Sequence, residues 1–280
     1  MTDTNIKFAW KKDKFDPKDY THAKVGFLTE VIPDSINLEQ YCPEVRNQGS
    51  LGSCTGHAFG GILSALALKQ GVFTEWFSPT WIYNGARFIE GTLQEDSGAY
   101  PSNCCKWIKS MGCLLEHDWP YNPTVLDIAP PSTDESDEAE AKKYPIITYI
   151  RVTGGAIGIM NALASGNMVA IGVPWFEEWF DIGPSGILPE ITDKNVTIGG
   201  HETFLYGYDK NKQVFYGQNS WGKDWGRRGR YTMPMSAFNI FKVFGGYDAH
   251  YVTVNWNNTQ KIVKKDSAWK RFFRKIFFGF

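Results

Sequence analysis

The sequence predicts an α+β fold in which a helix-rich half and a strand-rich half meet at a cleft. Helical patterns dominate the first half of the 280 residues, and aromatic strand patterns dominate the second half. Between them lies APPSTDESDEAEAKKYP, residues 129–145, whose Pro-Pro start and acidic first turn suit a short exposed helix or a linker. We expect a helix at this boundary.

The elements follow in order. A helix is predicted from Ser53, a candidate N-cap, to about Gln70, before Gly71, and another from Tyr100 to Met111, before Gly112. Residues 154–165 predict a further helix, and MVAIGV, 168–173, a buried strand. Residues 203–222 predict a hairpin whose turn contains Asn211, a residue suited to positive φ.

Composition excludes several classes of function. The formal net charge of −1 gives no field that would attract nucleic acid. The five cysteines are odd in number and lack the spacing of a secreted disulfide framework. The polar N-terminus has no signal-peptide core, and no apolar run would span a bilayer. We expect a cytoplasmic or otherwise intracellular protein with free thiols and neither metal nor organic cofactor.

The stretch NQGSLGSCTGHAFG, residues 47–60, places Cys54 one residue beyond the expected helix cap. A free thiol has a pKa of about 8.5, and a helix N-terminus favours the reactive thiolate. A buried structural thiol is the alternative. Nucleophilic catalysis also requires a base, a residue that orients it, and donors for an oxyanion. His201 in IGGHETF, Asn219 in GQNSWG and Gln48 are the candidates for these three roles.

With these residues in place, the sequence resembles the papain-like cysteine peptidases over most of its length. IPDSINLEQYCPEVRNQGSLGSC, GGHE and NSWGKDWGRRGRYTMP carry the resemblance, in the family's order. It implies Cys54 as nucleophile, His201 as general base and then acid, Asn219 as orienter and Gln48 as oxyanion donor. The implied fold has a left helical domain and a right β-barrel-like domain. The peptidase domain would span 32–256, with halves of about 45–145 and 146–256.

The resemblance also implies how a peptide binds. Substrate backbone would lie antiparallel to Ser97, Gly98 and Ala99, and Tyr100 and Pro101 would line the pocket for the second residue before the scissile bond. Three further residues complete the expected substrate site: Gly200, whose lack of a side chain permits close approach; Glu202, at the same pocket; and Trp221, which would shield the bond between Asn219 and His201.

Four features depart from the family pattern. Leu51 replaces a disulfide-forming cysteine, in agreement with a reducing location. Thr55 replaces the usual tryptophan, and we associate this Cys-Thr pair with microbial or viral members. Glu202 stands where a small residue is typical, and the segment before Ile32 is far shorter than a cathepsin propeptide.

Glu202 suggests a preference for Lys or Arg in that pocket. The more ordinary expectation is a carboxylate paired with Arg227, Arg228 or Arg230. His57, one helical turn after Cys54, is expected to be a helix histidine with a satisfied ring rather than a zinc ligand. Cys104 and Cys105 are expected to be core thiols rather than a redox pair.

The two ends of the chain carry separate expectations. Residues 1–31 would form an inhibitory latch or pro-segment, or else a surface strand. In residues 257–280, a basic amphipathic helix rich in aromatic residues suits an anionic membrane surface or a protein partner, and packing back onto the domain is equally expected. Peripheral membrane association or packaging in a virion would follow from the first case.

Together these features predict a thiol endopeptidase that cleaves protein or peptide substrates through a thioester intermediate. A catalytically silent binding protein of the same fold is one alternative. A thiol acyltransferase of the transglutaminase kind is another, although it would use Asp where this chain has Asn219.

Overall fold

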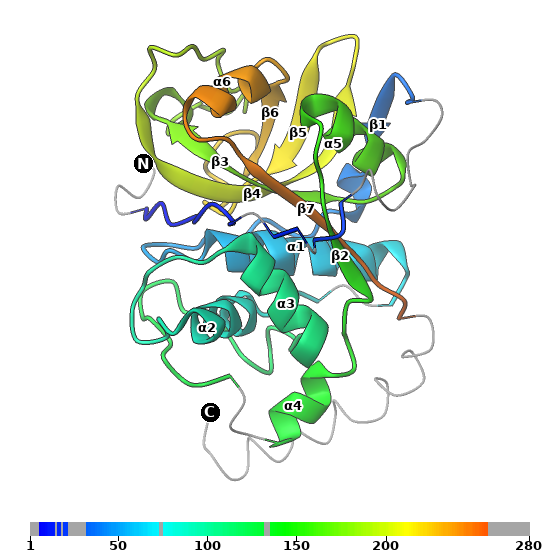
Figure 1. Ribbon diagram of the computed structural model, residues 1–280, viewed down its shortest axis with the longest axis vertical. Coiled ribbons are helices and arrows are strands. Elements are labelled where there is room, and N and C mark those ends of the chain that lie inside the picture. The colour runs from blue at the N-terminus through cyan, green and yellow to red at the C-terminus, as the bar shows by residue number, and fades with distance from the viewer. Residues whose placement is uncertain are drawn as a thin grey trace.

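The computed structural model describes residues 6–14, 16–17, 19–21, 32–72, 75–131 and 135–256. The fold has a helical layer and a layer built on one antiparallel sheet, which face each other across the middle of the molecule (Figure 1). No helix in these ranges is long and apolar enough to cross a bilayer. The predicted amphipathic helix at the C-terminus lies outside the described residues.

The helical layer is built from four α-helices: α1 (Cys54–Lys69), α2 (Pro79–Glu90), α3 (Pro101–Met111) and α4 (Glu135–Ala141). The predictions of α1, α3 and the boundary helix α4 are confirmed. Helix α2 was not predicted, although Ser78 caps it by accepting a hydrogen bond from the Trp81 amide and Pro79 occupies its first turn.

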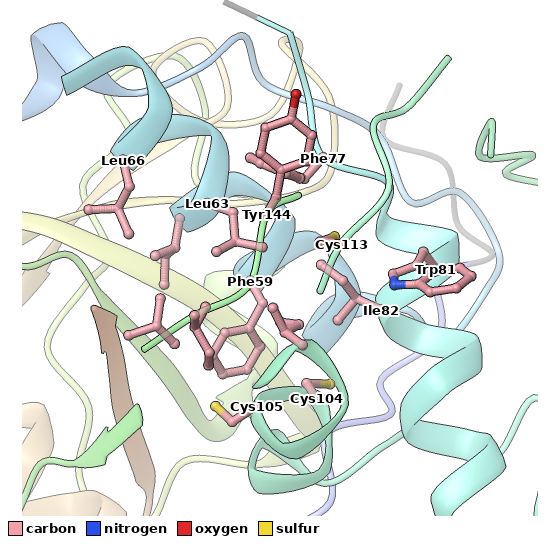
Figure 2. Packing of buried hydrophobic residues seen from close by; sticks show 14 of the residues in the cluster. Phe59, Leu63, Leu66, Phe77, Trp81, Ile82, Cys104, Cys105, Cys113 and Tyr144 are labelled. Atoms are coloured by element: carbon pink, nitrogen blue, oxygen red, sulfur yellow. The ribbon is translucent and has the colours of Figure 1, made fainter. Parts of the chain in front are cut away.

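Helix α1 is apolar on nearly every side, and it is buried from Cys54 to Ala67. Glycines let its neighbours approach closely, since a Cβ on Gly56 would lie 2.5 Å from the Pro79 carbonyl oxygen. Figure 2 shows Phe59 of this helix in the core of the helical layer, together with Cys104 and Cys105 of α3.

Among the residues that the structure describes, the sheet has seven strands and remains open, so the expected barrel-like half does not close there. Its order is β2-β7-β3-β4-β5-β6, with β1 also paired to β4. The strands are β1 (Ser35–Asn37), β2 (Thr148–Arg151), β3 (Val169–Phe176), β4 (Thr197–Asp209), β5 (Val214–Gln218), β6 (Arg230–Pro234) and β7 (Asp248–Thr253).

The remaining elements accompany the sheet. The helices are α5 (Gly155–Ala164) and α6 (Ala237–Val243), and two short 3₁₀ turns are Glu39–Tyr41 and Glu177–Trp179. The predicted hairpin is formed by β4 and β5. The residue at positive φ in its turn is Gln213 (φ 56°), so the choice of Asn211 was wrong. Gln213 is fixed there by its position just before β5, and its side chain donates to the Lys210 carbonyl.

The buried apolar residues form two hydrophobic cores. One joins α1, α2 and α3, and the other lies beneath the sheet with α5 and α6. Helix α1 packs against β4, and the backbone of Glu202, within β4, interacts with the sulfur of Cys54 at the start of α1. The proposed boundaries at residues 31, 145 and 256 stay predictions.

Candidate active site

Cys54 is the first residue of α1, and its side chain is fully buried. Ser53 occupies the N-cap position, but its hydroxyl lies 2.6 Å from the Tyr121 hydroxyl and bonds no backbone amide of the helix. The free amides at the start of the helix therefore remain available to an anion at the sulfur. Backbone groups of Glu202, Ala9 and Thr55 also interact with the Cys54 sulfur.

His201 lies within β4 directly opposite Val173 of β3, and it is fully buried. Its Nε2 is 2.7 Å from Oδ1 of Asn219. The Ser220 amide donates to the same oxygen (2.8 Å), which fixes the orientation of the Asn219 amide. An amide oxygen only accepts, so His201 Nε2 carries the proton and Nδ1 is the basic nitrogen. Within the described residues, Nδ1 has no hydrogen-bond partner.

Aromatic rings exclude water from this histidine–asparagine bond. The Trp221 ring lies over the His201 ring, with centroids 4.7 Å apart and planes tilted by 33°. The Trp175 ring is nearly perpendicular to the imidazole, with ring centroids 4.9 Å apart. A hydrogen bond in such a low-dielectric shell holds its geometry more strongly than one exposed to water. This is the shielding position expected for Trp221.

Gln48 is held beside the start of α1 by bonds at both ends of its side-chain amide. Its Oε1 accepts from the Ser220 hydroxyl (2.7 Å), which directs Nε2 toward the cleft. Nε2 donates to the Leu51 carbonyl (2.9 Å) and more weakly to the Lys7 carbonyl (3.4 Å). The second bond shows that a peptide carbonyl can reach this donor. The structure thus links Gln48 to Ser220, the residue after Asn219, and links Asn219 to His201, on a strand that packs against the helix beginning with Cys54.

Burial keeps both reacting groups neutral in this structure. Desolvation, followed by the nearby Glu202 carboxyl, raises the pKa of the Cys54 thiol to about 12, although three backbone interactions lower it. Desolvation lowers the pKa of His201 to about 4 despite the bond to Asn219. A thiolate–imidazolium pair would need water or a polar substrate at this site.

A segment of the chain's own N-terminus fills the cleft. We call residues 6–14 the arm; it runs between the helical layer and the sheet (Figure 1). Its Trp10 pairs with Ala99 in the parallel direction, and the Trp10 amide donates to the Gly200 carbonyl (2.9 Å). A substrate was expected to run antiparallel to this wall, so the arm runs in the opposite direction. It follows Ala99 and Gly200, two of the residues predicted to bind substrate.

Several glycines make room for the arm. A Cβ on Gly98 would lie 1.8 Å from the Ala9 carbonyl oxygen, and one on Gly52 would lie 2.5 Å from the Ala9 Cβ. One on Gly199 would lie 2.4 Å from the Phe8 Cβ. The close approach of backbone predicted at Gly98 and Gly200 is therefore present, with the arm as the peptide.

The other predicted substrate residues lie around the same path. The Ser97 hydroxyl accepts from the Lys11 ammonium (3.1 Å), and Lys11 also lies 5.5 Å from the Tyr100 ring centroid. Pro101 is buried at the first position of α3. Their roles toward a substrate stay predictions.

Glu202 is only 1% exposed and pairs with none of the three expected arginines, so that ordinary expectation was wrong. Arg227 instead bonds Glu39 (2.9 Å), and the Arg230 side chain is directed to the Pro43 carbonyl and to Glu39. Burial raises the pKa of Glu202 well above its ordinary value, and the carboxylates of two nearby acids raise it further.

Sequence reasoning missed a buried charged cluster that anchors the arm. The Asp13 backbone amide donates to the Asp248 carboxylate (2.6 Å). The Asp13 carboxylate accepts from the Ser102 amide and hydroxyl. Arg151 pairs with Asp13 (3.3 Å) and Asp248 (3.7 Å), and His250 lies 3.4 Å from Asp13. The only signal in the sequence was the isolated Arg and His within otherwise apolar strands.

The remaining expectations concern histidine and cysteine. His57 bonds the Ser53 carbonyl through Nδ1 (3.1 Å), but its Nε2 has no hydrogen-bond partner among the described residues, so the expected satisfied ring is only half present. Cys104 and Cys105 are fully buried free thiols in the core, as predicted. Among the described residues there is no group of three or more His, Cys, Asp and Glu side chains suited to a metal ion.

A buried cysteine begins a helix, the helix packs against the strand that carries His201, and His201 is bonded to Asn219. This arrangement resembles the Cys-His-Asn sites of cysteine hydrolases. The comparisons with known proteins agree with this class. Residues 32–242 match the model of the papain family cysteine proteases. The chain belongs to this family.

Related proteins occur in viruses and protists. An uncharacterized peptidase C1-like protein of Acanthamoeba polyphaga mimivirus is 32% identical over 207 residues, which cover 71% of this chain and 66% of the viral protein. The chain thus spans just under two thirds of that relative's length. Cysteine proteinase 3 of Entamoeba histolytica is 22% identical over 243 residues, covering 83% of this chain and 72% of the relative.

Solved structures share the fold. Xylellain, a cysteine protease from Xylella fastidiosa, superposes with a TM-score of 0.78 at 24% identity, covering 90% of this chain and 97% of xylellain. The Carica candamarcensis cysteine protease CMS1MS2, solved in complex with E-64, gives a TM-score of 0.61 at 18% identity and covers 80% of this chain and all of that chain. At these identities the likeness concerns the fold.

Proposed function

We propose that this protein is a thiol endopeptidase in which Cys54 and His201 act through a thioester intermediate. The single observation that carries the proposal is the bond between His201 Nε2 and Asn219 Oδ1 at 2.7 Å. It leaves Nδ1 as the basic nitrogen on a strand packed against the helix that begins with Cys54.

In the first half of the reaction, His201 accepts the Cys54 proton and the thiolate adds to the peptide carbonyl carbon. The Gln48 side-chain amide and the Cys54 backbone amide stabilise the oxyanion that forms. His201 then donates its proton to the leaving amine, the C–N bond breaks, and the acyl group remains on sulfur as a thioester.

In the second half, His201 accepts a proton from water and the resulting hydroxide adds to the thioester carbonyl. The C–S bond breaks as the tetrahedral intermediate collapses, releasing the acid and Cys54. Asn219 keeps the imidazole in one tautomer throughout, and Trp221 excludes water that would compete for their bond.

We further propose that the arm inhibits the enzyme until it leaves the cleft. Cys54, Gln48 and His201 are each 0% exposed, so no peptide reaches them in this conformation. The Ala9 backbone interacts with the Cys54 sulfur, and the ring centroids of Phe8 and His201 lie 6.0 Å apart. Because the arm runs opposite to the expected substrate direction, it covers the nucleophile without presenting a peptide bond in the expected orientation.

Peptide hydrolysis by the full chain tests the chemistry. We expect cleavage of an unstructured peptide pool and a trapped acyl adduct on Cys54, detected by mass spectrometry after an acid quench. Both are lost in Cys54→Ala and retained in the matched variant Cys42→Ala, whose half-buried thiol lies outside the site. Hydrolysis that Cys54→Ala leaves unchanged both in the full chain and in the Phe8→Ala protein, whose arm is loosened, would overturn the proposed function. Incorporation of amines without hydrolysis would favour an acyltransferase.

Phe8→Ala in the full chain tests the arm. Removing this ring should speed hydrolysis, whereas Lys14→Ala, at an exposed position of the same arm, should leave the rate unchanged. A synthetic peptide of residues 1–20 should inhibit the Phe8→Ala protein in trans. If neither substitution changes the rate and the peptide does not inhibit, the arm is not an inhibitor.

A further inference from the structure

Two acidic residues flank a glycine on the sheet beneath the arm. Gly172 of β3 lies directly opposite Glu202 on β4 and directly opposite Asp248 on β7. Side chains of directly paired residues project from the same face of a sheet. The row Glu202–Gly172–Asp248 therefore has a carboxyl group on each side and a gap in the middle, which we call the acidic pocket.

The indole of Trp10 fills the acidic pocket in this structure. A Cβ on Gly172 would lie 2.0 Å from Trp10 Nε1, and one on Gly200, two residues before Glu202 on the same face, would lie 2.5 Å from Trp10 Cε3. Trp10 Nε1 has no hydrogen-bond partner among the described residues. The acidic pocket therefore accepts a long, flat side chain. The neutral indole that fills it makes no hydrogen bond with the polar groups of the pocket.

Glu202 is the unsatisfied group. Neither of its carboxyl oxygens has a hydrogen-bond partner in the described part of the chain, although the side chain is almost completely buried. Buried polar groups are nearly always paired, so an acid left unpaired in a gap between strands points to a missing donor.

The cations nearby are already engaged. Arg151 pairs with Asp13, Asp19 and Asp248. Burial lowers the pKa of His250 to about 3, which keeps it neutral. When the arm withdraws with Asp13, Glu202 and Asp248 remain against the single charge of Arg151. The empty pocket would then attract a positively charged side chain.

The acidic pocket lies one residue away from the nucleophile along a bound peptide. Ala9 lies at the Cys54 sulfur, and the next residue, Trp10, enters the pocket. The arm runs parallel to the chain at Ala99, and its residue after the one at the sulfur enters the acidic pocket. A substrate that runs antiparallel to Ala99 has the reverse direction, so the residue before the one at the sulfur enters the acidic pocket. This is the second residue before the scissile bond.

We propose that Glu202, with Asp248 on the far side of Gly172, selects a Lys or Arg side chain at the second residue before the scissile bond. This selection rests on the proposed function and specifies the substrate class of the same cleft. A guanidinium or ammonium in the gap left by Gly172 would give Glu202 the donor it lacks, and the aliphatic stem would occupy the place of the indole.

The test compares matched peptides that differ only in Arg, Lys, Leu or Phe at that position, using the Phe8→Ala protein so that the arm does not limit access. We expect kcat/KM for Arg to exceed that for Leu by about 10- to 100-fold, the range for one hydrogen bond to a charged group. Glu202→Gln should reduce this ratio to about one. The control Glu177→Gln, at an exposed position after β3, should keep it.

The ratio is the decisive quantity because Glu202 also raises the pKa of the Cys54 thiol. Glu202→Gln changes that pKa for every peptide alike, so a change in absolute rate does not affect the Arg/Leu ratio. Cleavage of all four peptides at similar rates would overturn selection by Glu202 and leave the peptidase intact. Cleavage of none, with no acyl adduct on Cys54, would overturn the proposed function and the selection with it.

A second variant tests the pocket without altering Glu202. Trp10→Arg in the otherwise natural chain should hold the arm more tightly and slow hydrolysis about tenfold relative to Trp10→Leu, because the arm itself would then supply the missing cation. If Trp10→Arg releases the arm as fully as Trp10→Leu does, the pocket does not recognise a positive charge.

Discussion

The arm contacts two buried regions of opposite character. Around His201 the surroundings are aromatic, with Trp221, Trp175 and Phe8 packed near the imidazole. Around Asp13 the surroundings are ionic, with Asp248 and Arg151 in direct contact. The first region buries the proposed catalytic residues under aromatic rings, and the second holds the arm in place by charge. Covering the catalytic residues should therefore be insensitive to pH, and anchoring the arm should depend on it.

The largest effect should come from the catalytic side of this comparison. We expect His201→Ala to reduce kcat about 10⁴-fold or more in the Phe8→Ala protein, because proton transfer is lost in both halves of the reaction. Asn219→Ala should cost less, since it orients the base without exchanging a proton. The measurement is kcat for one fluorogenic peptide. A loss in His201→Ala of less than tenfold would be incompatible with His201 as the base.

The aromatic contacts should dominate how tightly the arm covers the site. Burial of a Phe side chain contributes roughly 1.5–3 kcal/mol, so Phe8→Ala should raise the hydrolysis rate of the full chain about 10- to 100-fold. This gain should be the same at pH 5 and pH 8, because no charge is removed. A gain confined to one end of that range would place Phe8 in the ionic anchor instead.

The ionic anchor should make arm release depend on pH. Burial and then the Asp13 charge raise the pKa of Asp248 to about 7 in the docked state, and burial also raises that of Asp13. Docking therefore takes up protons, so the arm is held most tightly at low pH. It loosens as the pH rises from about 4 to about 7, by up to about tenfold per pH unit for one group. The charged and titratable groups around Asp248 are Asp13, Arg151, Lys12, His250 and Glu202.

The rate ratio of the full chain to its Asp248→Asn variant, measured from pH 4.5 to 8, isolates this dependence from that of catalysis. This ratio should rise with pH, whereas the ratio of the full chain to Glu177→Gln should stay constant. A ratio to Asp248→Asn that falls with rising pH would reverse the sign expected from these carboxyl groups.

The smallest effect should be on stability. Burial raises the pKa of Glu202 in the folded protein. Above about pH 4.5 the Glu202 carboxyl ionises in the unfolded chain, so this residue lowers the free energy of unfolding there. Glu202→Gln should raise the free energy of unfolding at pH 7 by about 1 kcal/mol, and the gain should shrink as the pH falls toward 4. Urea unfolding at both values measures it. Destabilisation at pH 7 would imply a partner for Glu202.

The elements that carry the proposed catalytic residues could be predicted from the sequence because each is encoded locally. Cys54 follows a glycine-rich turn into a strongly apolar helix, and His201 and Asn219 are joined by one hairpin. The arm was predicted only as a segment, because residues 6–14 have no periodic pattern and dock through backbone bonds and glycine gaps supplied by distant strands. The acidic pocket could not be predicted from the sequence either, since the pairing of Glu202, Gly172 and Asp248 depends on the order of three strands in the sheet.

The rate at which an epoxysuccinyl thiol inhibitor alkylates Cys54 tests most directly whether an intact catalytic pair lies covered beneath the arm. At pH 7 the full chain should react slowly, and Phe8→Ala should react at least about tenfold faster. The faster reaction should disappear when His201→Ala is added. Equal rates in the full chain and Phe8→Ala, or a rate unaffected by His201→Ala, would contradict the account.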